Sequence, residues 1–227
     1  MIFSRKRAAG RHARDERATE APETAEGAAP AQAEPARGPY DVTEAPDGVQ
    51  RLDLGSLQIP AVPDVEVRVQ ADQQGVIQQV VLVHGQSALQ LGVFAAPRSE
   101  GIWDEVREEI RQSLFKDGAA AQEVSGEYGT ELHARVRTED GLTDLRFVGV
   151  DGPRWMVRAV YQGEAATNPA AAGPLVQCLD GLVVDRGGEA KPVREPLPLR
   201  LPRDEAEQAG QAGAEAEADA ASAPGAR

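Results

Sequence analysis

The sequence predicts a single α+β domain, with a largely antiparallel sheet of about six to seven strands and two helices packed on one of its faces. Three observations support this class. Short apolar segments alternate with polar residues at period two, turn residues separate them, and two segments with helical spacing interrupt the series. Runs of hairpin-linked strands with helices between them are typical of α+β domains with antiparallel sheets.

Large apolar side chains are confined to the middle of the chain. Eight of the nine aromatic residues lie between Tyr40 and Tyr161, and only a segment with such side chains can bury a core. The predicted organisation is a disordered N-terminal tail over residues 1–39, one domain over 40–202 whose residues 190–202 form an extended Pro-rich arm along its surface, and a disordered, acidic Ala/Glu-rich tail over 203–227.

An antiparallel meander is expected in the first half of the domain. A separate apolar segment over residues 49–59 is expected before it. After this segment, Val65, Val67 and Val69 alternate with polar residues, which is typical of a half-buried strand. Turn residues then separate two further apolar runs. The three strands are expected over residues 64–71, 76–83 and 88–95.

The clearest helix is predicted over residues 102–116. Trp103 and Ile110 belong to an apolar stripe at helical spacing, and Ser99 is placed to cap the first turn. Four carboxylates crowd the first turns, where we expect a solvated face rather than a paired-carboxylate acid–base site. These carboxylates belong to Asp104, Glu105, Glu108 and Glu109.

Three further strands, a short helix and a last extended segment complete the domain. The strands are expected over residues 130–138, 142–150 and 154–161, and the extended segment over 182–184. Either Asn168-Pro169 or Gly173-Pro174 opens the helix, which ends near Asp180.

Charge and composition make several functions unfavourable. The net charge is −13, and residues 38–202 carry 15 Arg/Lys against 25 Asp/Glu, so no nucleic-acid partner is expected. There is no apolar run of 18 residues and no apolar stretch after the basic N-terminus, so we expect a cytoplasmic protein without membrane insertion. Cys178 is the single cysteine, which leaves no intrachain disulfide and no thiol metal cluster.

No catalytic, cofactor-binding or metal site is predicted. The histidines His12, His84 and His133 do not stand at metal-ligand spacing. His84 and Ser87 could form a base and a nucleophile, but a hairpin turn explains the segment better. Residues 126–129 resemble half of a phosphate loop, yet they precede a strand, so a bend between strands is expected.

Arginines form the most interesting group, because they cluster on strands of an acidic domain. If those strands are neighbours, a basic stripe on the exposed side of the sheet could bind an acidic partner or a phosphorylated ligand. The alternative is cross-strand pairing with Glu131, Glu139 and Asp144. The arginines of this possible face are Arg135, Arg137, Arg146, Arg154 and Arg158.

Four segments carry a resemblance to a known family. They are residues 126–132 (GEYGTEL), 146–155 (RFVGVDGPRW), 182–187 (LVVDRG) and 197–202 (LPLRLP). Over roughly residues 40–202 the chain resembles an actinobacterial domain of unknown function, family 3710. The resemblance implies a cytoplasmic bacterial protein and transfers no catalytic residue.

These observations favour a non-enzymatic binding or adaptor module with a protein partner, whose identity the sequence does not give. The alternative is a binder of small anionic ligands, or an enzyme of unrecognised type, that uses the Arg-lined face of the sheet. A concave pocket lined by Arg135, Arg146 or Arg158 would favour this alternative.

Overall fold

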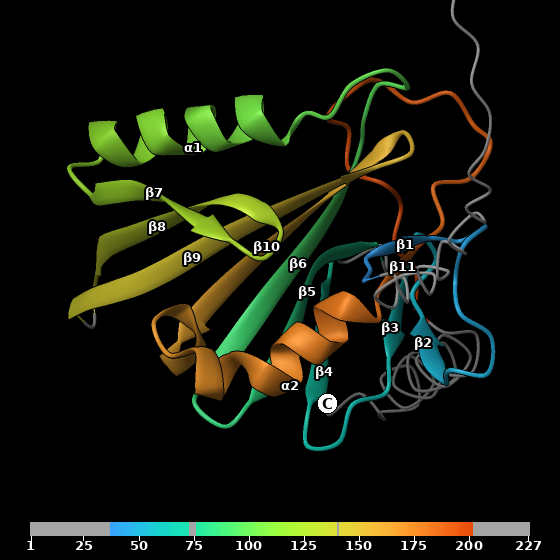
Figure 1. Ribbon diagram of the computed structural model, residues 1–227, viewed down its shortest axis with the longest axis horizontal. Helices are drawn as coiled ribbons and strands as arrows, with labels where there is room; N and C mark the ends of the chain where they lie inside the picture. The colour runs from blue at the N-terminus through green and yellow to red at the C-terminus, as the bar shows by residue number, and fades with distance from the viewer. Residues whose placement is uncertain (1–36, 73–75, 140, 202–227) are drawn as a thin grey trace, which may run out of the picture. The chain divides into compact units, whose positions relative to one another are not determined.

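Two sheets carry the fold in the computed structural model, which describes residues 37–72, 76–139 and 141–201 (Figure 1). The larger sheet has seven strands in the order β4-β5-β6-β10-β9-β8-β7, and every neighbouring pair is antiparallel. Its strands are β4 (Glu66–Ala71), β5 (Ile77–His84), β6 (Ser87–Ala95), β7 (Ala120–Gly126), β8 (Gly129–Thr138), β9 (Gly141–Gly152) and β10 (Trp155–Gly163). The predicted α+β class is confirmed.

A smaller sheet of four short strands lies beside it, in the order β1-β11-β3-β2. Its first two strands, β1 and β11, are parallel, and the other pairs are antiparallel. The apolar segment expected over residues 49–59 contributes β2 and β3 to this sheet. The strands are β1 (Tyr40–Asp41), β2 (Arg51–Asp53), β3 (Leu57–Pro60) and β11 (Val183–Val184).

Both predicted helices are present, α1 (Trp103–Lys116) and α2 (Pro169–Asp180), and a 3₁₀ turn, η1 (Glu164–Ala166), precedes α2. The Asn168 side chain accepts a hydrogen bond from the Ala170 N–H at 3.1 Å, so α2 begins at the first of its two possible starts. Neither described helix is long and apolar enough to cross a bilayer.

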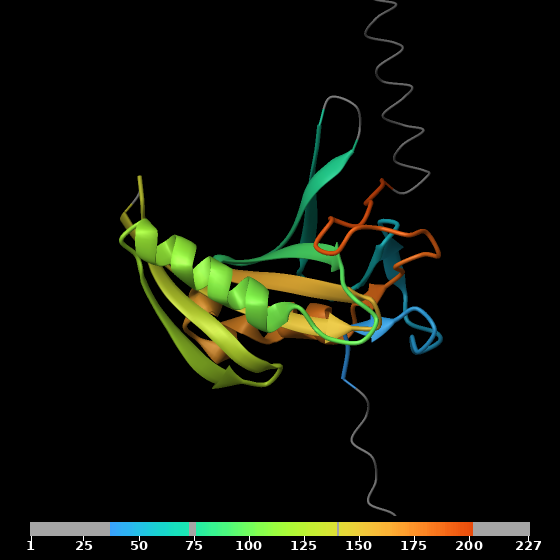
Figure 2. The same ribbon diagram turned by 90° about the horizontal axis from the view of Figure 1, so that it is seen from above.

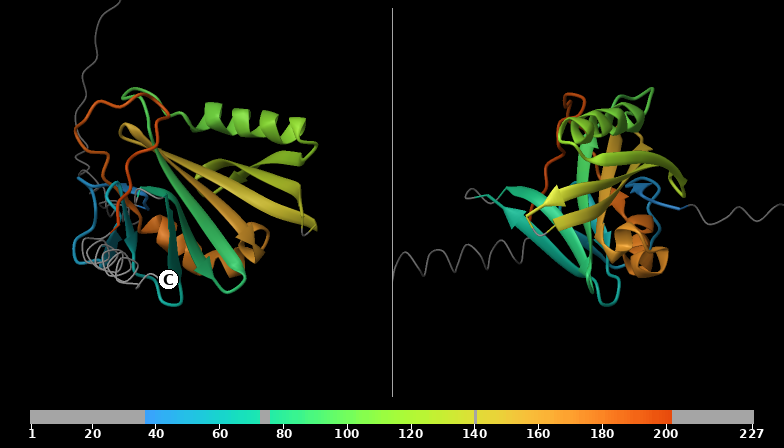
Figure 3. Two further views of the ribbon diagram at one scale, coloured as in Figure 1. Left: turned by 180° about the vertical axis from the view of Figure 1, so that it is seen from behind. Right: turned by 90° about the vertical axis from the view of Figure 1, so that its left-hand side faces the viewer.

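The helices pack on opposite faces of the large sheet, which corrects the expectation that both cover one face. Successive residues of a strand point to opposite faces. On β10, Val157 and Ala159 belong to the core beneath α2, whereas Met156 packs with Trp103 of α1. We name these two sides the α2 face and the α1 face. In Figure 1, α2 lies in front of the sheet, and it lies beyond the sheet in the rear view of Figure 3.

The main core fills the space between the α2 face, α2 and the small sheet. Leu175, Cys178 and Leu179 of α2 are fully buried there. Burial raises the pKa of the Cys178 thiol to about 11, so it packs as a small apolar group. Away from this core, the β4–β5 hairpin projects from the rest of the sheet (Figure 2).

A residue distant in sequence caps α1. The carboxylate of Asp151, on β9, accepts hydrogen bonds from the backbone N–H groups of Ile102 (2.8 Å) and Trp103 (3.2 Å). The expected cap, Ser99, makes no such bond, since α1 has no side-chain cap from its own N-terminal segment. A carboxylate at this end of a helix also complements the helix dipole. Asp151 therefore joins α1 to the sheet.

The Pro-rich arm follows the end of β6 and reaches α1. Leu197 is buried, and its N–H donates to the carbonyl oxygen of Val93 at 2.9 Å. Arg194 forms ion pairs with Glu105 and Glu109, both at 2.6 Å. The acidic face of α1 is therefore paired with arginine on the surface.

The two-residue strand β1 is missing from the sequence-based expectation, and so is β7. β7 is an edge strand whose only large apolar residue is Val124, so it lacks the alternation that marks a strand in sequence. The turn that follows it, at residues 127–128, is part of the expected bend. The turn residues expected at 73–75 and at Asp140 lie outside the described residues.

Candidate functional site

The structure divides the five predicted arginines between several places. Arg135 and Arg137 of β8 and Arg146 of β9 share the α2 face, because they occupy corresponding positions in the antiparallel register. Arg158 lies on the α1 face of β10, and Arg154 lies in the β9–β10 turn with a φ of 64°. Because β9 separates β8 from β10, the five do not form one stripe.

Arg158 is half-buried and separate from the other arginines. Its guanidinium carbon lies 5.3 Å from the centre of the Phe94 ring, a cation–π contact. Burial lowers the pKa of Arg158. Arg158 lies on the α1 face where β10 pairs with β6.

Arg135 is paired across the strands, as the alternative interpretation of the sequence predicted. Its Nε and Nη2 atoms donate to the two carboxylate oxygens of Asp144 at 2.7 and 2.9 Å. This bidentate hydrogen bond lowers the pKa of Asp144. The pair presents one positive and one negative group to solvent on the α2 face.

Beside this pair lies a polar interior, which we define as Glu131, His133, Arg146 and Tyr161. Glu131 is only 6% exposed. Its Oε2 atom lies 3.4 Å from His133 Nε2 and 3.5 Å from Arg146 Nε. The Arg146 guanidinium stacks on the Tyr161 ring, 4.2 Å from its centre. A carboxylate, an imidazole, a guanidinium and a phenol therefore meet inside the fold.

Gly126 makes room for the Glu131 carboxylate. A Cβ atom at residue 126 would lie 1.9 Å from Glu131 Oε1, so the glycine permits this close approach. The glycine-containing hairpin between β7 and β8 thus positions a side chain of the polar interior.

Two buried polar atoms of this interior have no hydrogen-bond partner within the described residues, the Tyr161 hydroxyl and Arg146 Nε. Such atoms are uncommon, because burying an unpaired polar group costs free energy. Burial raises the pKa of Tyr161, an effect that the nearby Arg146 charge partly offsets. The phenol therefore remains protonated and able to donate.

A second tyrosine closes the cluster toward the end of α2. The Tyr128 hydroxyl donates to Asp180 Oδ1, and Arg37 Nε lies 3.0 Å from the same oxygen. Burial, followed by the hydrogen bond to Asp180, raises the pKa of Tyr128. This group joins the β7–β8 turn to the end of α2.

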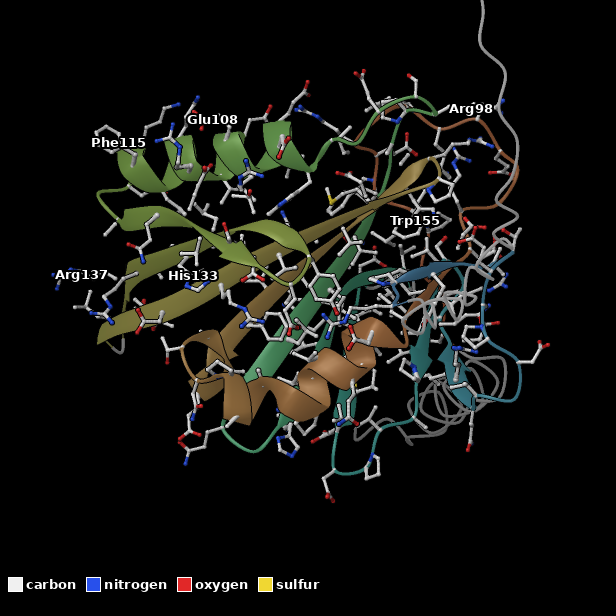
Figure 4. All side chains as sticks on the ribbon, viewed as in Figure 1. Arg98, Glu108, Phe115, His133, Arg137 and Trp155 are labelled. Carbon is white, nitrogen blue, oxygen red and sulfur yellow. The ribbon has the colours of Figure 1, made fainter. Side chains whose placement is uncertain are left out.

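A groove of about 380 Å³ lies next to His133. Gln122, His133, Arg135 and Asp144 line it from the sheet, and Thr167 lines it from the segment after η1. We call it the β8 groove. Figure 4 shows His133 between β8 and α2, with Arg137 at the end of the strands, outside the groove lining.

Ser87 holds the segment that covers the groove. Its hydroxyl is buried and accepts a hydrogen bond from the Ala165 N–H of η1 at 3.0 Å. His84 lies directly opposite Ser87 in the β5–β6 hairpin. The hydroxyl thus has a structural partner, in agreement with the hairpin interpretation of this segment.

The groove lining carries several kinds of polar group. Gln122 and Thr167 offer neutral donors and acceptors, His133 can donate or accept, and Arg135 supplies a guanidinium. In the described part of the chain, no three His, Cys, Asp or Glu side chains are placed to hold a metal ion. His133 lies within a strand expected from the sequence, but its meeting with Glu131 and Arg146 depends on the pairing of β8 with β9, which local patterns do not give.

The fold and the groove define an α+β domain with a concave polar site on one sheet face. The chain belongs to the family described as "Protein of unknown function (DUF3710)", which it matches over residues 38–208. This match confirms the family resemblance seen in the sequence.

Other comparisons add little detail. No curated protein matches the chain. A structural comparison matches the chain with a Bacteroides thetaiotaomicron VPI-5482 protein solved by crystallography at 1.50 Å, with a TM-score of 0.40 and 13% identity. That similarity covers 71% of this chain, which spans 57% of the crystallised chain.

Proposed function

We propose that this domain is a non-enzymatic binding protein whose β8 groove takes a small polar ligand with an anionic group. The observation that carries the proposal is the position of the groove, which has His133 in its wall and the polar interior directly behind that residue. Ligand sites commonly combine a concave surface with a few convergent polar groups. The volume of about 380 Å³ suits a small molecule.

Charge favours an anionic group that approaches from solvent. Arg135 is exposed and its only described partner, Asp144, leaves part of the guanidinium fork free to bind a second oxygen. The Asp144 carboxylate can in turn accept a hydrogen bond from a donor on the ligand. A molecule with a carboxylate or phosphate and a hydroxyl or amine complements this pair. The proposal places the protein in the bacterial cytoplasm, as composition predicts.

The test is a ligand screen followed by substitution. The full chain is screened by thermal shift against amino acids, dicarboxylates and phosphorylated metabolites, and each hit is measured by calorimetry. His133→Ala should weaken binding at least about ten-fold, the effect of one lost charge-assisted or buried hydrogen bond. Arg137→Ala, on the same strand and face but outside the groove, should change affinity less than about two-fold.

Ligands that bind His133→Ala and wild type equally would place their site elsewhere and overturn the proposal. A complete absence of hits among these classes of ligand would also count against the proposal, because the polar groups of the groove complement these classes.

A protein-binding role is a second candidate, which Phe115 favours. Its side chain is 81% exposed at the end of α1, next to a shallow hollow lined by Glu108 and Arg111. Large exposed aromatic groups are enriched where proteins bind one another. A partner captured by wild type and lost with Phe115→Ser, but kept with His133→Ala, would support this role.

A further inference from the structure

We propose a second binding site, for a phosphoryl group, in a pocket of about 370 Å³ between the small sheet and the Pro-rich arm. Gly55 and Ser56 line it from the β2–β3 connection, Arg186 from the segment after β11, and Lys191 and Arg200 from the arm. We call it the arm pocket. It lies on residues other than those of the β8 groove and does not depend on the function proposed above.

Backbone hydrogen bonds hold the walls of the arm pocket. The Ser56 N–H donates to the Pro198 carbonyl at 3.3 Å, and the Arg200 N–H donates to the Leu54 carbonyl at 2.9 Å. The Asp185 N–H donates to the Ser56 carbonyl at 3.1 Å. Three segments far apart in sequence are thereby fixed to one another around the pocket.

Arg186 is the central observation. Its residue exposure is only 9%, and its Nε atom is buried without a partner among the described residues. Its Nη1 atom donates to the carbonyl oxygens of Gly187 and Glu189. No described carboxylate forms an ion pair with it. A buried cation that meets only carbonyl oxygens lacks the counter-charge that usually accompanies burial.

The other cations of the pocket are also weakly paired. Arg200 forms no ion pair within the described ranges, and Lys191 Nζ lies 3.6 Å from Glu195 Oε1, at the long end for a salt bridge. Two acids oppose them in the lining, Asp185 and Glu189. The Asp185 carboxylate already accepts the Gly187 N–H at 2.9 Å. The lining therefore carries three positive and two negative side chains, in a chain whose net charge is −13.

This arrangement fits a phosphoryl dianion better than a carboxylate. Guanidinium groups offer planar pairs of donors that match phosphate oxygens, and lysine adds a point charge. With Asp185 and Glu189 counted, the lining carries one net positive charge, so the preference for a phosphoryl group rests on the number of its oxygens, which two guanidinium forks and a lysine can bind together. The pocket volume leaves space for a small molecule attached to the phosphoryl group.

The experiment is a calorimetric titration of the full chain with inorganic phosphate, pyrophosphate and succinate at fixed ionic strength. We expect saturable binding of phosphate or pyrophosphate, tighter than that of succinate. Arg200→Ala and Lys191→Ala, both on the pocket wall, should each weaken it at least about ten-fold, since each removes a charge-assisted contact. Arg137 is an exposed arginine on β8 of the large sheet, outside the arm pocket. Arg137→Ala should therefore change the affinity for phosphate less than about two-fold.

Arg186→Lys tests the geometry of binding, because lysine keeps the positive charge but lacks the planar pair of guanidinium donors. It should weaken phosphate binding while circular dichroism confirms the fold. Equal affinity for succinate would overturn the phosphoryl assignment. A loss in Arg137→Ala that equals the loss in Arg200→Ala, or no saturable binding of either phosphate, would overturn the site. Phosphate binding that is lost in His133→Ala and kept in Arg200→Ala would lie in the β8 groove and would also overturn the site.

Discussion

The two ends of the sheet face beneath α2 differ in chemistry although they share one sheet. At the end formed by β5, β6 and β10, Leu82 and Leu89 are fully buried in an apolar core. On β8 and β9, Glu131, His133 and Arg146 occupy the same face. A buried ion pair is often no more stabilising than apolar residues of similar volume. The polar end is therefore not explained by stability alone, and we propose that it serves the binding role of the β8 groove.

The two helices lie on opposite faces of the large sheet. This placement explains how its α2 face can be apolar at one end and polar at the other. On β8, Leu132 and Ala134 are buried on the α1 face, which leaves the His133 side for the groove. On β6, the fully buried side is the α2 face. The apolar side of the sheet therefore changes from one end to the other.

The largest effect is expected at the apolar end. Leu179→Ala removes a fully buried side chain of α2 and should lower the free energy of unfolding by about 2–5 kcal/mol, through lost burial and a residual cavity. Chemical denaturation measures this change. As the matched control, the exposed Phe115→Ala should stay within about 0.5 kcal/mol of wild type. Similar values for both variants would show that α2 does not seal an apolar core.

A smaller effect is expected where α1 joins the sheet. Asp151→Ala removes two hydrogen bonds to the first turn of α1 and should cost about 1–2 kcal/mol. Ser99→Ala tests the cap that sequence alone suggested, and we expect no measurable change in unfolding. If Ser99→Ala were the more harmful substitution, the capping role of Asp151 would be wrong.

The smallest effect is a pH dependence at the apolar end, where Trp155 Nε1 donates to Asp41 Oδ2 at 3.0 Å. Burial opposes ionisation of Asp41, but hydrogen bonds from Thr43 and Trp155 outweigh it and lower its pKa. A lowered pKa stabilises the fold above the unfolded value of about 4, and this contribution is lost as pH falls through the folded value. Asp41→Asn should be less stable than wild type at pH 7.

Unfolding curves of the two proteins between pH 7 and pH 2 measure this dependence. The stability difference should shrink below about pH 4. A difference that stayed constant across this range would exclude the Asp41 carboxylate as its source.

Local patterns in the sequence predicted most of the fold. The alternation of Val65, Val67 and Val69 and the apolar stripe of α1 carry their own signals. The edge strand β7 has no such signal, and the Asp151 cap joins positions about 50 residues apart. Local periodicity also does not state which face a helix covers, so it could not place α1 and α2 on opposite faces.

The candidate site was predictable only in part. The pairing of Arg135 with Asp144 follows from a tight hairpin, and sequence offered it as an alternative. The meeting of Glu131 with Arg146 depends on the register of β8 and β9 and on space at Gly126. A row of polar residues on a strand normally indicates exposure to solvent. The sequence does not reveal that η1 and α2 cover this row.

The most direct test of the central claim is the unfolding free energy of the double variant Glu131→Leu/Arg146→Met. Glu131→Leu alone leaves Arg146 without its carboxylate and should cost about 3–5 kcal/mol. With apolar groups at both positions, the double variant should regain wild-type stability or exceed it, and the β8 groove should no longer bind its ligand. A double variant as unstable as the single one would show that the polar interior holds the fold, and would contradict this account.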